Sequence, residues 1–357
     1  PTESSPSDVD TVLQADFSAG IEGNAEQIKA MWEDLKRAGI GAPFFEEIAP
    51  VRQSNNHWID VYRHGNGLCI LKKRIERSNY GRSGDWQAVR NLAAARRDSI
   101  VPLFVPENDP GVYYELDLRG FGYRPFDPGW LTDGRRKKIM EAVDKGLRFG
   151  RETWFLQGHL HQGNILVKLD GQGEIEDVRI IDFSLLKEER VSGNLVLTYI
   201  RDRSPVSLKG HRIQDGELEW MDLSGLDFHG VELSFRSIFG CILNGTDFSG
   251  ANMEKTRLVY SDTRGMILKD AEPYAVNFSG LDMTDVVLDG AWLDGLEVVD
   301  SLKLARHLDK AKGLRNARLW FPVTPKMSDA EVLERVEWRS DRSSRGDHLR
   351  PEGPRWS

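Results

Sequence analysis

The residue types best suited to chemistry lie in one run, from Gln157 to Val167, which contains two histidines. An unperturbed imidazole has a pKa of about 6.5, so His159 could serve as a general base near neutral pH. His159 and His161 also form an H-x-H pair of the kind found in metal sites, but no third His or carboxylate is clearly placed beside them. We therefore expect His161 to be a buried, hydrogen-bonded histidine of a loop.

An apolar hairpin is expected directly after this run. The segments Ile165 to Leu169 and Val178 to Ile181 are short and apolar, and the polar turn Asp170-Gly171-Gln172-Gly173 lies between them. Gly-rich polar residues between two apolar runs are typical of a β-hairpin. The pattern predicts two strands, with Asn164 just before the first and Asp182 just after the second.

These residues together resemble a known signature. The run Gln157-Gly158-His159-Leu160-His161-Gln162-Gly163-Asn164-Ile165-Leu166, followed by Ile181-Asp182-Phe183, is similar to the H-G-D-L-H-P-G-N-I-L and I-D-F sequences of the aminoglycoside-phosphotransferase and lipopolysaccharide-kinase branch of the kinase superfamily. The departures are Gln157, His159 and Gln162. The resemblance implies a kinase-like α+β domain in which Asn164 and Asp182 hold magnesium. It also implies that His159 replaces the aspartate that receives the substrate hydroxyl proton.

The same resemblance implies an upstream strand whose lysine pairs the phosphates of ATP. The strand is expected over Leu68 to Lys73, where Lys72 fits the register best and Lys73 is the second candidate. The family would place a glutamate on the next helix to hold this lysine. Only Asp85 or Gln87 is available there.

Two further nucleotide contacts follow from the resemblance. The small polar turn at residues 53–56 would cover the phosphates, which makes Asn55 a candidate. The segment from Val112 to Leu116 would be the hinge strand that presents groups to adenine, which makes Glu115 another candidate. The implied cofactors are ATP and Mg²⁺.

The change at His159 leaves the activity open. One hypothesis is a pseudokinase-like protein that binds ATP and magnesium and acts as a binding or scaffold protein. The alternative is an active transferase, for phosphoryl or adenylyl groups, with His159 as base and a small molecule, saccharide or protein as acceptor. Little in the sequence after Asp182 resembles the helical substrate lobe of a kinase. One helix is expected before the histidine run, at about residues 133–151.

A second feature, a period of five residues, begins at about residue 206. The third residue of each pentad is apolar almost throughout, and the first is mostly small or aliphatic. The third positions include Leu223, Phe228, Leu233, Ile238, Leu243, Phe248, Met253, Leu258, Leu268 and Leu288. This period suits neither a helix nor a flat strand. It resembles the pentapeptide-repeat pattern, which implies an all-β right-handed quadrilateral β-helix, with distortion expected at Thr263 and Pro273.

The repeat region is acidic. Residues 206–300 contain seventeen Asp and Glu against seven Lys and Arg. Outward acids such as Asp222, Asp227, Glu232 and Asp289 would repel nucleic acid and could attract a basic protein partner. Some pentapeptide-repeat proteins, the quinolone-resistance group, imitate DNA, so a DNA mimic or a rod-centred interaction protein is a further alternative.

These patterns predict five segments: residues 1–44 with one helix, a minimal kinase-like domain at 45–205, the solenoid at 206–300, a helical cap at 301–338 and a disordered tail at 339–357. Two cysteines, one of them at the inward position of Cys241, argue against a disulfide framework and for a reducing, cytoplasmic setting. No apolar run is long enough to span a membrane, and no secretory leader is visible.

Overall fold

The computed structural model describes residues 25–38, 45–54, 57–75, 84–95, 97–107, 109–273, 276, 281–293 and 312. The chain divides into two compact units. The first contains the residues up to Leu197 together with Asp215–Trp220, and the second contains Thr198–Gln214 and the residues from Met221 onward. Asn55, the tail at 339–357 and, apart from Lys312, the expected helical cap at 301–338 lie outside the described residues. Lys312 forms a parallel bridge with Val287 of the repeats, so this residue of the expected cap pairs as a strand does.

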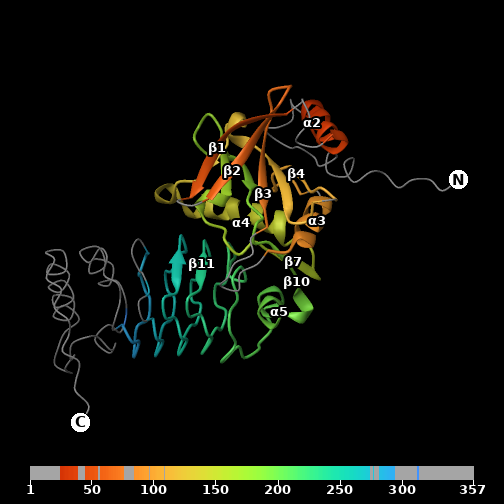
Figure 1. The fold of residues 1–357 in the computed structure, drawn as a ribbon. Helices are drawn as coiled ribbons and strands as arrows, with labels where there is room; N and C mark the ends of the chain where they lie inside the picture. Colours follow the sequence, from red (N-terminus) through yellow and green to blue (C-terminus); the bar gives the residue numbers. More distant parts are fainter. Residues whose placement is uncertain are drawn as a thin grey trace, which may run out of the picture. The chain divides into compact units, whose positions relative to one another are not determined.

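Unit 1 contains a five-stranded antiparallel sheet with the order β1-β2-β3-β5-β4 (Figure 1). Its strands are β1 (Phe45–Ser54), β2 (His57–His64), β3 (Cys69–Arg74), β4 (Leu103–Phe104) and β5 (Val112–Leu116). The strands expected upstream of the histidine run are therefore confirmed. All five residues of β5 are buried, so this strand lies in the interior and not at a solvated edge.

Two helices accompany this sheet. Helix α2 (Ala25–Ala38) buries Ile28, Met31, Trp32 and Leu35 at helical spacing, and its Asp34 Oδ2 lies 2.9 Å from His64 Nε2 of β2. Helix α3 (Trp86–Ala95) buries Ala88, Val89, Leu92 and Ala93. Gly84, two residues before this helix, has no room for a Cβ, which would lie 2.1 Å from the Ser184 carbonyl oxygen. That close approach brings the start of α3 against the chain that follows Asp182.

The remainder of unit 1 carries the predicted hairpin. Strands β8 (Ile165–Leu169) and β9 (Ile175–Ile180) pair antiparallel, and β6 (Arg124–Pro125) adds to β8. Strand β7 (Thr153–Leu156) pairs with β10 (Lys187–Arg190). Helix α4 (Asp133–Leu147) begins at the capping hydroxyl of Thr132 and ends a turn earlier than expected. Short 3-10 helices occupy Leu118–Phe121, Pro128–Trp130, Gln162–Asn164 and Val191–Gly193, and helix α5 spans Leu195–Asp202.

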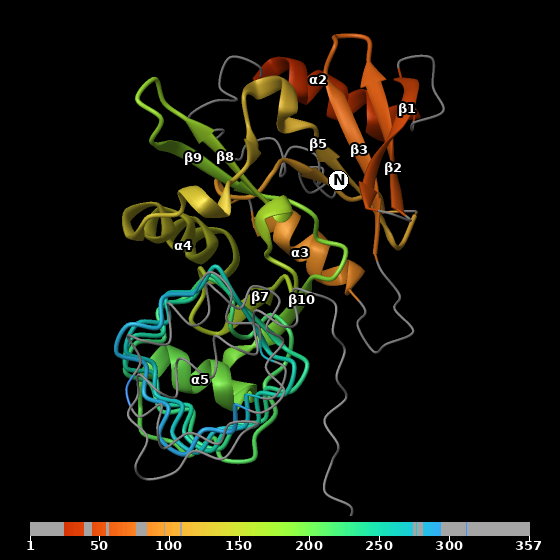
Figure 2. The ribbon, with the colours of Figure 1, turned by 90° about the vertical axis from the view of Figure 1, so that its left-hand side faces the viewer.

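Unit 2 is built from stacked coils. Parallel bridges join residues twenty positions apart, as in Asp222↔Ile242 and Ile242↔Asp262. The short strands β11 (Ser237–Phe239) and β12 (Arg257–Val259) pair with the same offset. Seen along the stack in Figure 2, the coils drawn in green to blue superimpose. A repeat of four pentads per coil follows from this offset, as the sequence predicts.

The inward register of the pentads is confirmed where the structure describes it. The third residues from Leu208 to Leu268 are each at most 4 % exposed. Thr263 also fits inside, because its hydroxyl donates to the Asp282 carbonyl at 2.6 Å, and Pro273 is buried too. Asp262 beside it keeps its bridge to Ile242 of the preceding coil, but among the described residues no bridge joins Asp262 to Asp282 of the next coil. The ladder is thus interrupted at this face, in line with the expected distortion at Thr263.

The fifth residue of most pentads has a positive φ, the region that favours glycine. Where glycine is missing, other residues adopt the same conformation. These are Trp220, Phe235, Lys255, Tyr260, Asp270 and Asp285, whose φ angles lie between 50° and 62°. The turn geometry is thus imposed by the stack, even on side chains that disfavour it.

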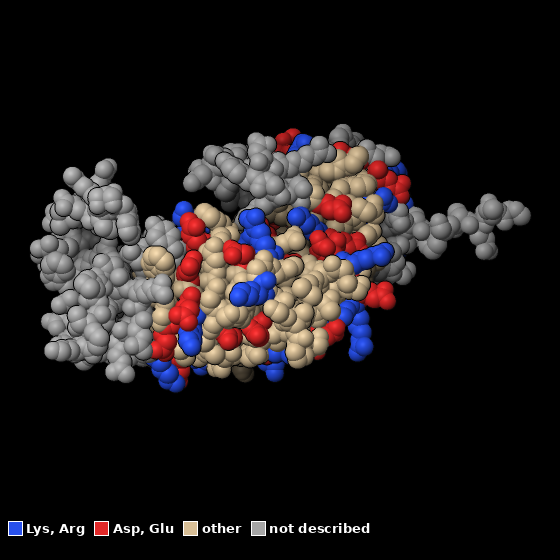
Figure 3. Space-filling model, turned by 90° about the horizontal axis from the view of Figure 1, so that it is seen from below, with Lys and Arg blue, Asp and Glu red and all other residues tan. Residues whose placement is uncertain are grey.

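The acids at the second position of the pentads have a structural role. Asp222, Asp227, Asp247 and Asp282 each accept a hydrogen bond from the backbone N–H two residues later, at 2.8 to 3.0 Å. Aspartate and asparagine favour this local turn in general. Figure 3 shows acidic side chains interspersed with Lys and Arg on the face drawn. The frequency of aspartate therefore has a reason that needs no partner.

The first coil of unit 2 is covered by the end of α5. The Tyr199 ring packs edge-on against Phe228, and its hydroxyl oxygen accepts the backbone N–H of Asp227 at 2.6 Å. Arg203 donates to the carbonyls of Asp222 and Ser224. These contacts satisfy backbone groups that an open coil end would leave unpaired.

Within the described residues, no helix combines the length and the apolar character needed to cross a membrane. Cys69 and Cys241 are both free thiols.

Candidate functional site

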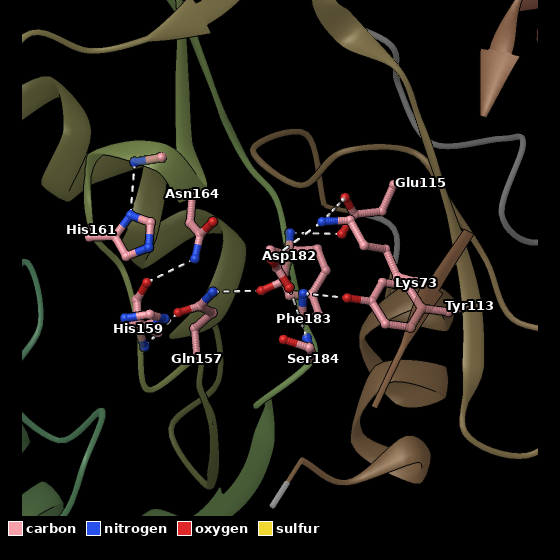
Figure 4. A network of polar contacts seen from close by, with 11 residues as sticks. Lys73, Tyr113, Glu115, Gln157, His159, His161, Asn164, Asp182, Phe183 and Ser184 are labelled. Carbon is pink, nitrogen blue, oxygen red and sulfur yellow. Dashed lines mark hydrogen bonds and ion pairs between the residues drawn. The ribbon is translucent and has the colours of Figure 1, made fainter. Parts of the chain in front are cut away.

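Strand β3 carries Lys73 into the interior of unit 1. Its Nζ lies 3.3 Å from Asp182 Oδ2 and 3.9 Å from Glu115 Oε2 (Figure 4). The three residues are 5 %, 6 % and 1 % exposed. Lys72, which the register favoured, is half-buried and has no such contact among the described residues. The structure brings the second candidate, Lys73, to Asp182.

Glu115 is the carboxylate partner of Lys73. Its side chain is fully buried, which raises its pKa to about 7; Lys73 opposes this shift and Asp182 adds to it. Its Oε1 accepts the backbone N–H of Asp182 at 2.7 Å, while Oε2 makes no hydrogen bond. The glutamate that lies beside Lys73 thus comes from strand β5 and not from helix α3. Asp85 and Gln87 are exposed, and Asp85 only caps the start of α3.

The backbone at Asp182 is held from several sides. Its φ of 62° is unusual for a residue other than glycine. Its carbonyl accepts from Gln157 Nε2 at 2.6 Å, and its Oδ1 accepts the Ser184 N–H at 3.3 Å. The buried Tyr113 hydroxyl accepts the Phe183 N–H at 2.8 Å. These contacts fix the carboxylate of Asp182 in one place.

Gln157 joins the backbone of Asp182 to the histidine run. Its Oε1 accepts the N–H of His159 at 2.7 Å, and the His159 carbonyl accepts Asn164 Nδ2 at 3.0 Å. Because the amide nitrogen of Asn164 is used in this way, its Oδ1 is the atom left to face a cation. Asn164 is also tied to the strand end, since its carbonyl accepts the Ile181 N–H at 3.0 Å. Asn164 and Asp182 thus belong to one hydrogen-bonded network.

The two histidines do not converge on a common point. Their rings lie edge to face at 4.4 Å between centroids. His161 Nδ1 accepts the Gly163 N–H at 2.9 Å, which confirms the expected loop role, although the side chain is half-buried and not fully buried. No group of three His, Cys, Asp or Glu side chains that could hold a metal occurs in the part of the chain that the structure describes.

A further set of residues contacts this loop and is not predicted by the sequence pattern. Segment Asp215–Trp220, which the pentad pattern assigns to the repeats, belongs to unit 1. The buried carboxylate of Glu219 accepts the N–H groups of Gly158 and Leu160, and Trp220 Nε1 donates to the Leu160 carbonyl. The only signal in the sequence is that Trp220 stands where glycine is usual. The contact itself is not encoded locally.

No family model matches the chain, and no curated protein matches it. One solved structure that it resembles in part is QnrB1, described as a plasmid-mediated fluoroquinolone resistance protein and a pentapeptide-repeat protein. The likeness has 19 % identity and a TM-score of 0.17, and it covers 25 % of this chain and 39 % of QnrB1.

Proposed function

We propose that unit 1 is a kinase-like domain that binds ATP together with Mg²⁺, and that unit 2 is a right-handed quadrilateral β-helix of pentapeptide repeats. The observation that carries the proposal is the buried contact of Lys73 with Asp182 and Glu115. Kinase-type phosphotransferases rely on a lysine paired with a glutamate and on a metal-binding aspartate and asparagine nearby. Lys73, Glu115, Asp182 and Asn164 resemble this set, although Glu115 comes from strand β5 and not from a helix.

The chemistry of these groups suits the proposed ligand. Mg²⁺ prefers oxygen ligands and is usually held by one or two carboxylates plus substrate phosphates, so a set of three protein acids is not required. Asp182 and the Oδ1 of Asn164 would be the protein ligands. Lys73 would offer its charge to the phosphates, and Glu115 would keep it oriented. When bound, the metal would neutralise charge on the phosphates.

The lysine role is therefore proposed for Lys73 in place of Lys72. Burial supports this choice, because a lysine that is 5 % exposed needs charged partners, whereas a half-exposed lysine can reach solvent. Glu115 is proposed as the lysine partner and not as an adenine contact, since its carboxylate points to Lys73 and to the Asp182 N–H. Asn55 stays a prediction outside the described residues.

The proposed activity is ATP binding by a pseudokinase-like protein, because His159 replaces the expected aspartate. A neutral imidazole lacks the negative charge that would complement the acceptor hydroxyl and the metal site. One observation favours the alternative of an active transferase: Gln157 and Asn164 hold the backbone of His159 on both sides. With its backbone held, His159 would present an imidazole that can accept a proton from an acceptor hydroxyl.

A basic protein partner for the acidic repeat face stays a secondary proposal. The turn contacts of Asp222, Asp227, Asp247 and Asp282 account for their positions without a partner. The test of such a partner would be salt-dependent binding.

The main proposal is tested by titrating the full chain with ATP and Mg²⁺ in a calorimeter. Wild type is expected to bind, and Lys73→Met is expected to weaken binding by about tenfold or more, which is about 1.4 kcal/mol. Lys72→Met is the matched control and should change the Kd by less than about threefold. Absence of binding at millimolar ATP, or equal losses from the two lysine variants, would contradict the proposal.

A further inference from the structure

The segment Asp215–Trp220 belongs to unit 1, although the residues before and after it belong to unit 2. The chain leaves unit 1 after Leu197, contributes Thr198–Gln214 to unit 2, returns to unit 1 for six residues, and then continues into the repeats at Met221. In the pentad register this segment contains one unit, Gly216 to Trp220. Its residues from Glu217 to Trp220 are each at most 2 % exposed.

This segment satisfies the backbone of the histidine loop. Glu219 Oε2 accepts the Gly158 N–H and Oε1 accepts the Leu160 N–H, both at 3.2 Å. Trp220 Nε1 donates to the Leu160 carbonyl at 2.8 Å. The two N–H groups flank His159, so one carboxylate holds the loop on either side of that residue.

The segment is itself held firmly in unit 1. Arg148 of the α4 C-cap donates to the carbonyls of Glu219 and Trp220 at 2.7 and 2.6 Å. The Trp220 ring meets Phe126 edge-on at 5.4 Å between centroids. Gly216 has a φ of 90°, and a Cβ there would lie 3.0 Å from Leu156 Cβ and 3.1 Å from Gly158 N. A glycine is therefore required for the segment to lie this close to the loop.

We propose that Glu219 and Trp220 are positioning residues for the nucleotide and metal site. The inference rests on the proposed function of that site. By fixing the peptides at Gly158 and Leu160, they hold the His159 carbonyl where it receives Asn164 Nδ2. That hydrogen bond turns Asn164 Oδ1 toward the place of the cation. The binding site is thus completed by a segment that the chain places within its first repeats.

The carboxylate of Glu219 is needed because it accepts two backbone N–H groups, those of Gly158 and Leu160. A carboxylate offers two acceptor oxygens to two N–H groups, whereas the amide of a Gln would turn an NH₂ donor toward one of them. Glu219→Gln keeps the shape of the side chain and removes one acceptor. A buried N–H left without a partner destabilises the loop conformation. Trp220→Phe removes the hydrogen bond to Leu160 and keeps most of the ring.

The matched control is Glu217→Gln. Glu217 lies in the same segment and is 0 % exposed, but its Oε1 accepts Asn194 Nδ2 at 2.6 Å and not a loop N–H. Both variants alter a buried glutamate, so both lower the melting temperature of the ligand-free protein. They differ in that Glu219 accepts the N–H groups of Gly158 and Leu160 in the loop.

The test uses the full chain with two readouts. The first is hydrogen–deuterium exchange of peptides that cover residues 157–164, and the second is the Kd for ATP with Mg²⁺. We expect Glu219→Gln and Trp220→Phe to speed exchange in this peptide by about tenfold, and Glu219→Gln to weaken the Kd by about tenfold. Glu217→Gln should leave both close to the wild-type values.

The two readouts separate the two proposals. If wild type binds ATP and Glu219→Gln binds it equally well, the positioning role is wrong and Glu219 only stabilises the fold. If wild type does not bind ATP at all, the proposed function fails, and exchange alone decides the loop contact. Faster exchange in Glu219→Gln but not in Glu217→Gln then supports the role in holding the loop, and equal exchange in both overturns it.

Discussion

Glu115 and Asp182 lie 67 positions apart in the chain, and Glu115 Oε1 accepts the backbone N–H of Asp182 at 2.7 Å. Two carboxylate residues are thus joined through a neutral backbone group, while Lys73 lies between their side chains. The positive charge of Lys73 offsets the proximity of two buried acids. This relationship links strands β3 and β5 to the end of β9.

The first prediction concerns pH. Burial raises the pKa of Glu219 from 4.5 to about 7, against the lowering effect of its two backbone hydrogen bonds. A carboxyl whose pKa is raised on folding contributes stability that is present below its unfolded pKa and is lost as pH rises through the folded pKa. Between pH 4.5 and 7 the free energy of unfolding of wild type should therefore fall, relative to Glu219→Gln, by about 3 kcal/mol. The measurement is denaturant unfolding of both proteins across this pH window. Parallel pH profiles would show that Glu219 titrates normally.

A second prediction concerns His159. For a protein that only binds ATP, labelled phosphate release or adenylyl transfer should be absent from both wild type and His159→Ala. Binding of ATP should be nearly equal in the two proteins, because the backbone contacts of His159 do not depend on its side chain. Turnover by wild type that is lost in His159→Ala would favour the transferase instead. Turnover that survives the change would exclude His159 as the base.

The core of the repeats can be tested with two phenylalanines. Phe248 is fully buried and stacks on Phe228 at 5.4 Å between centroids, so Phe248→Ala should cost about 3–5 kcal/mol. Phe235 is 56 % exposed, and Phe235→Ala should cost less than about 1 kcal/mol. Thermal unfolding followed by circular dichroism is the measurement. Similar losses from the two variants would mean that the inward register is wrong.

A fourth prediction compares two lysines in the turns of the repeats. Lys255 occupies a fifth position with a φ of 53°, whereas Lys269 occupies a fourth position outside the positive-φ region. Glycine at position 255 would relieve the strain of a positive φ, whereas glycine at position 269 would only add backbone freedom to the unfolded chain. Lys255→Gly should therefore be more stable than Lys269→Gly by about 1 kcal/mol. The reverse order in thermal unfolding would contradict the conformation assigned to the fifth position.

Local pattern was sufficient to predict the repeats and the hairpin. A period of five recurs within a few residues, so the inward positions from Leu208 to Leu268 follow from the sequence alone. The strands β8 and β9 likewise follow from two apolar runs with a polar turn between them. The nearness of Asn164 and Asp182 follows from the same hairpin, because they stand at its two ends.

Other features depended on contacts between distant segments. Lys72 and Lys73 are adjacent, and alternation alone does not decide which one is buried; the packing of Asp182 and Glu115 around Lys73 does. The partner of the lysine comes from β5 and not from α3, because the interior position of β5 places Glu115 beside it.

The sequence by itself determined the pentad register, the hairpin and the candidate pair Asn164 and Asp182. Only the tertiary structure decided that Lys73 lies beside Asp182 and Glu115 and that Glu219 and Trp220 contact the histidine loop. The physical reason is the distance along the chain over which each interaction acts. Periodicity and turn chemistry act over a few residues, whereas the partner of a buried charge is selected by whichever distant segment satisfies it in the folded chain.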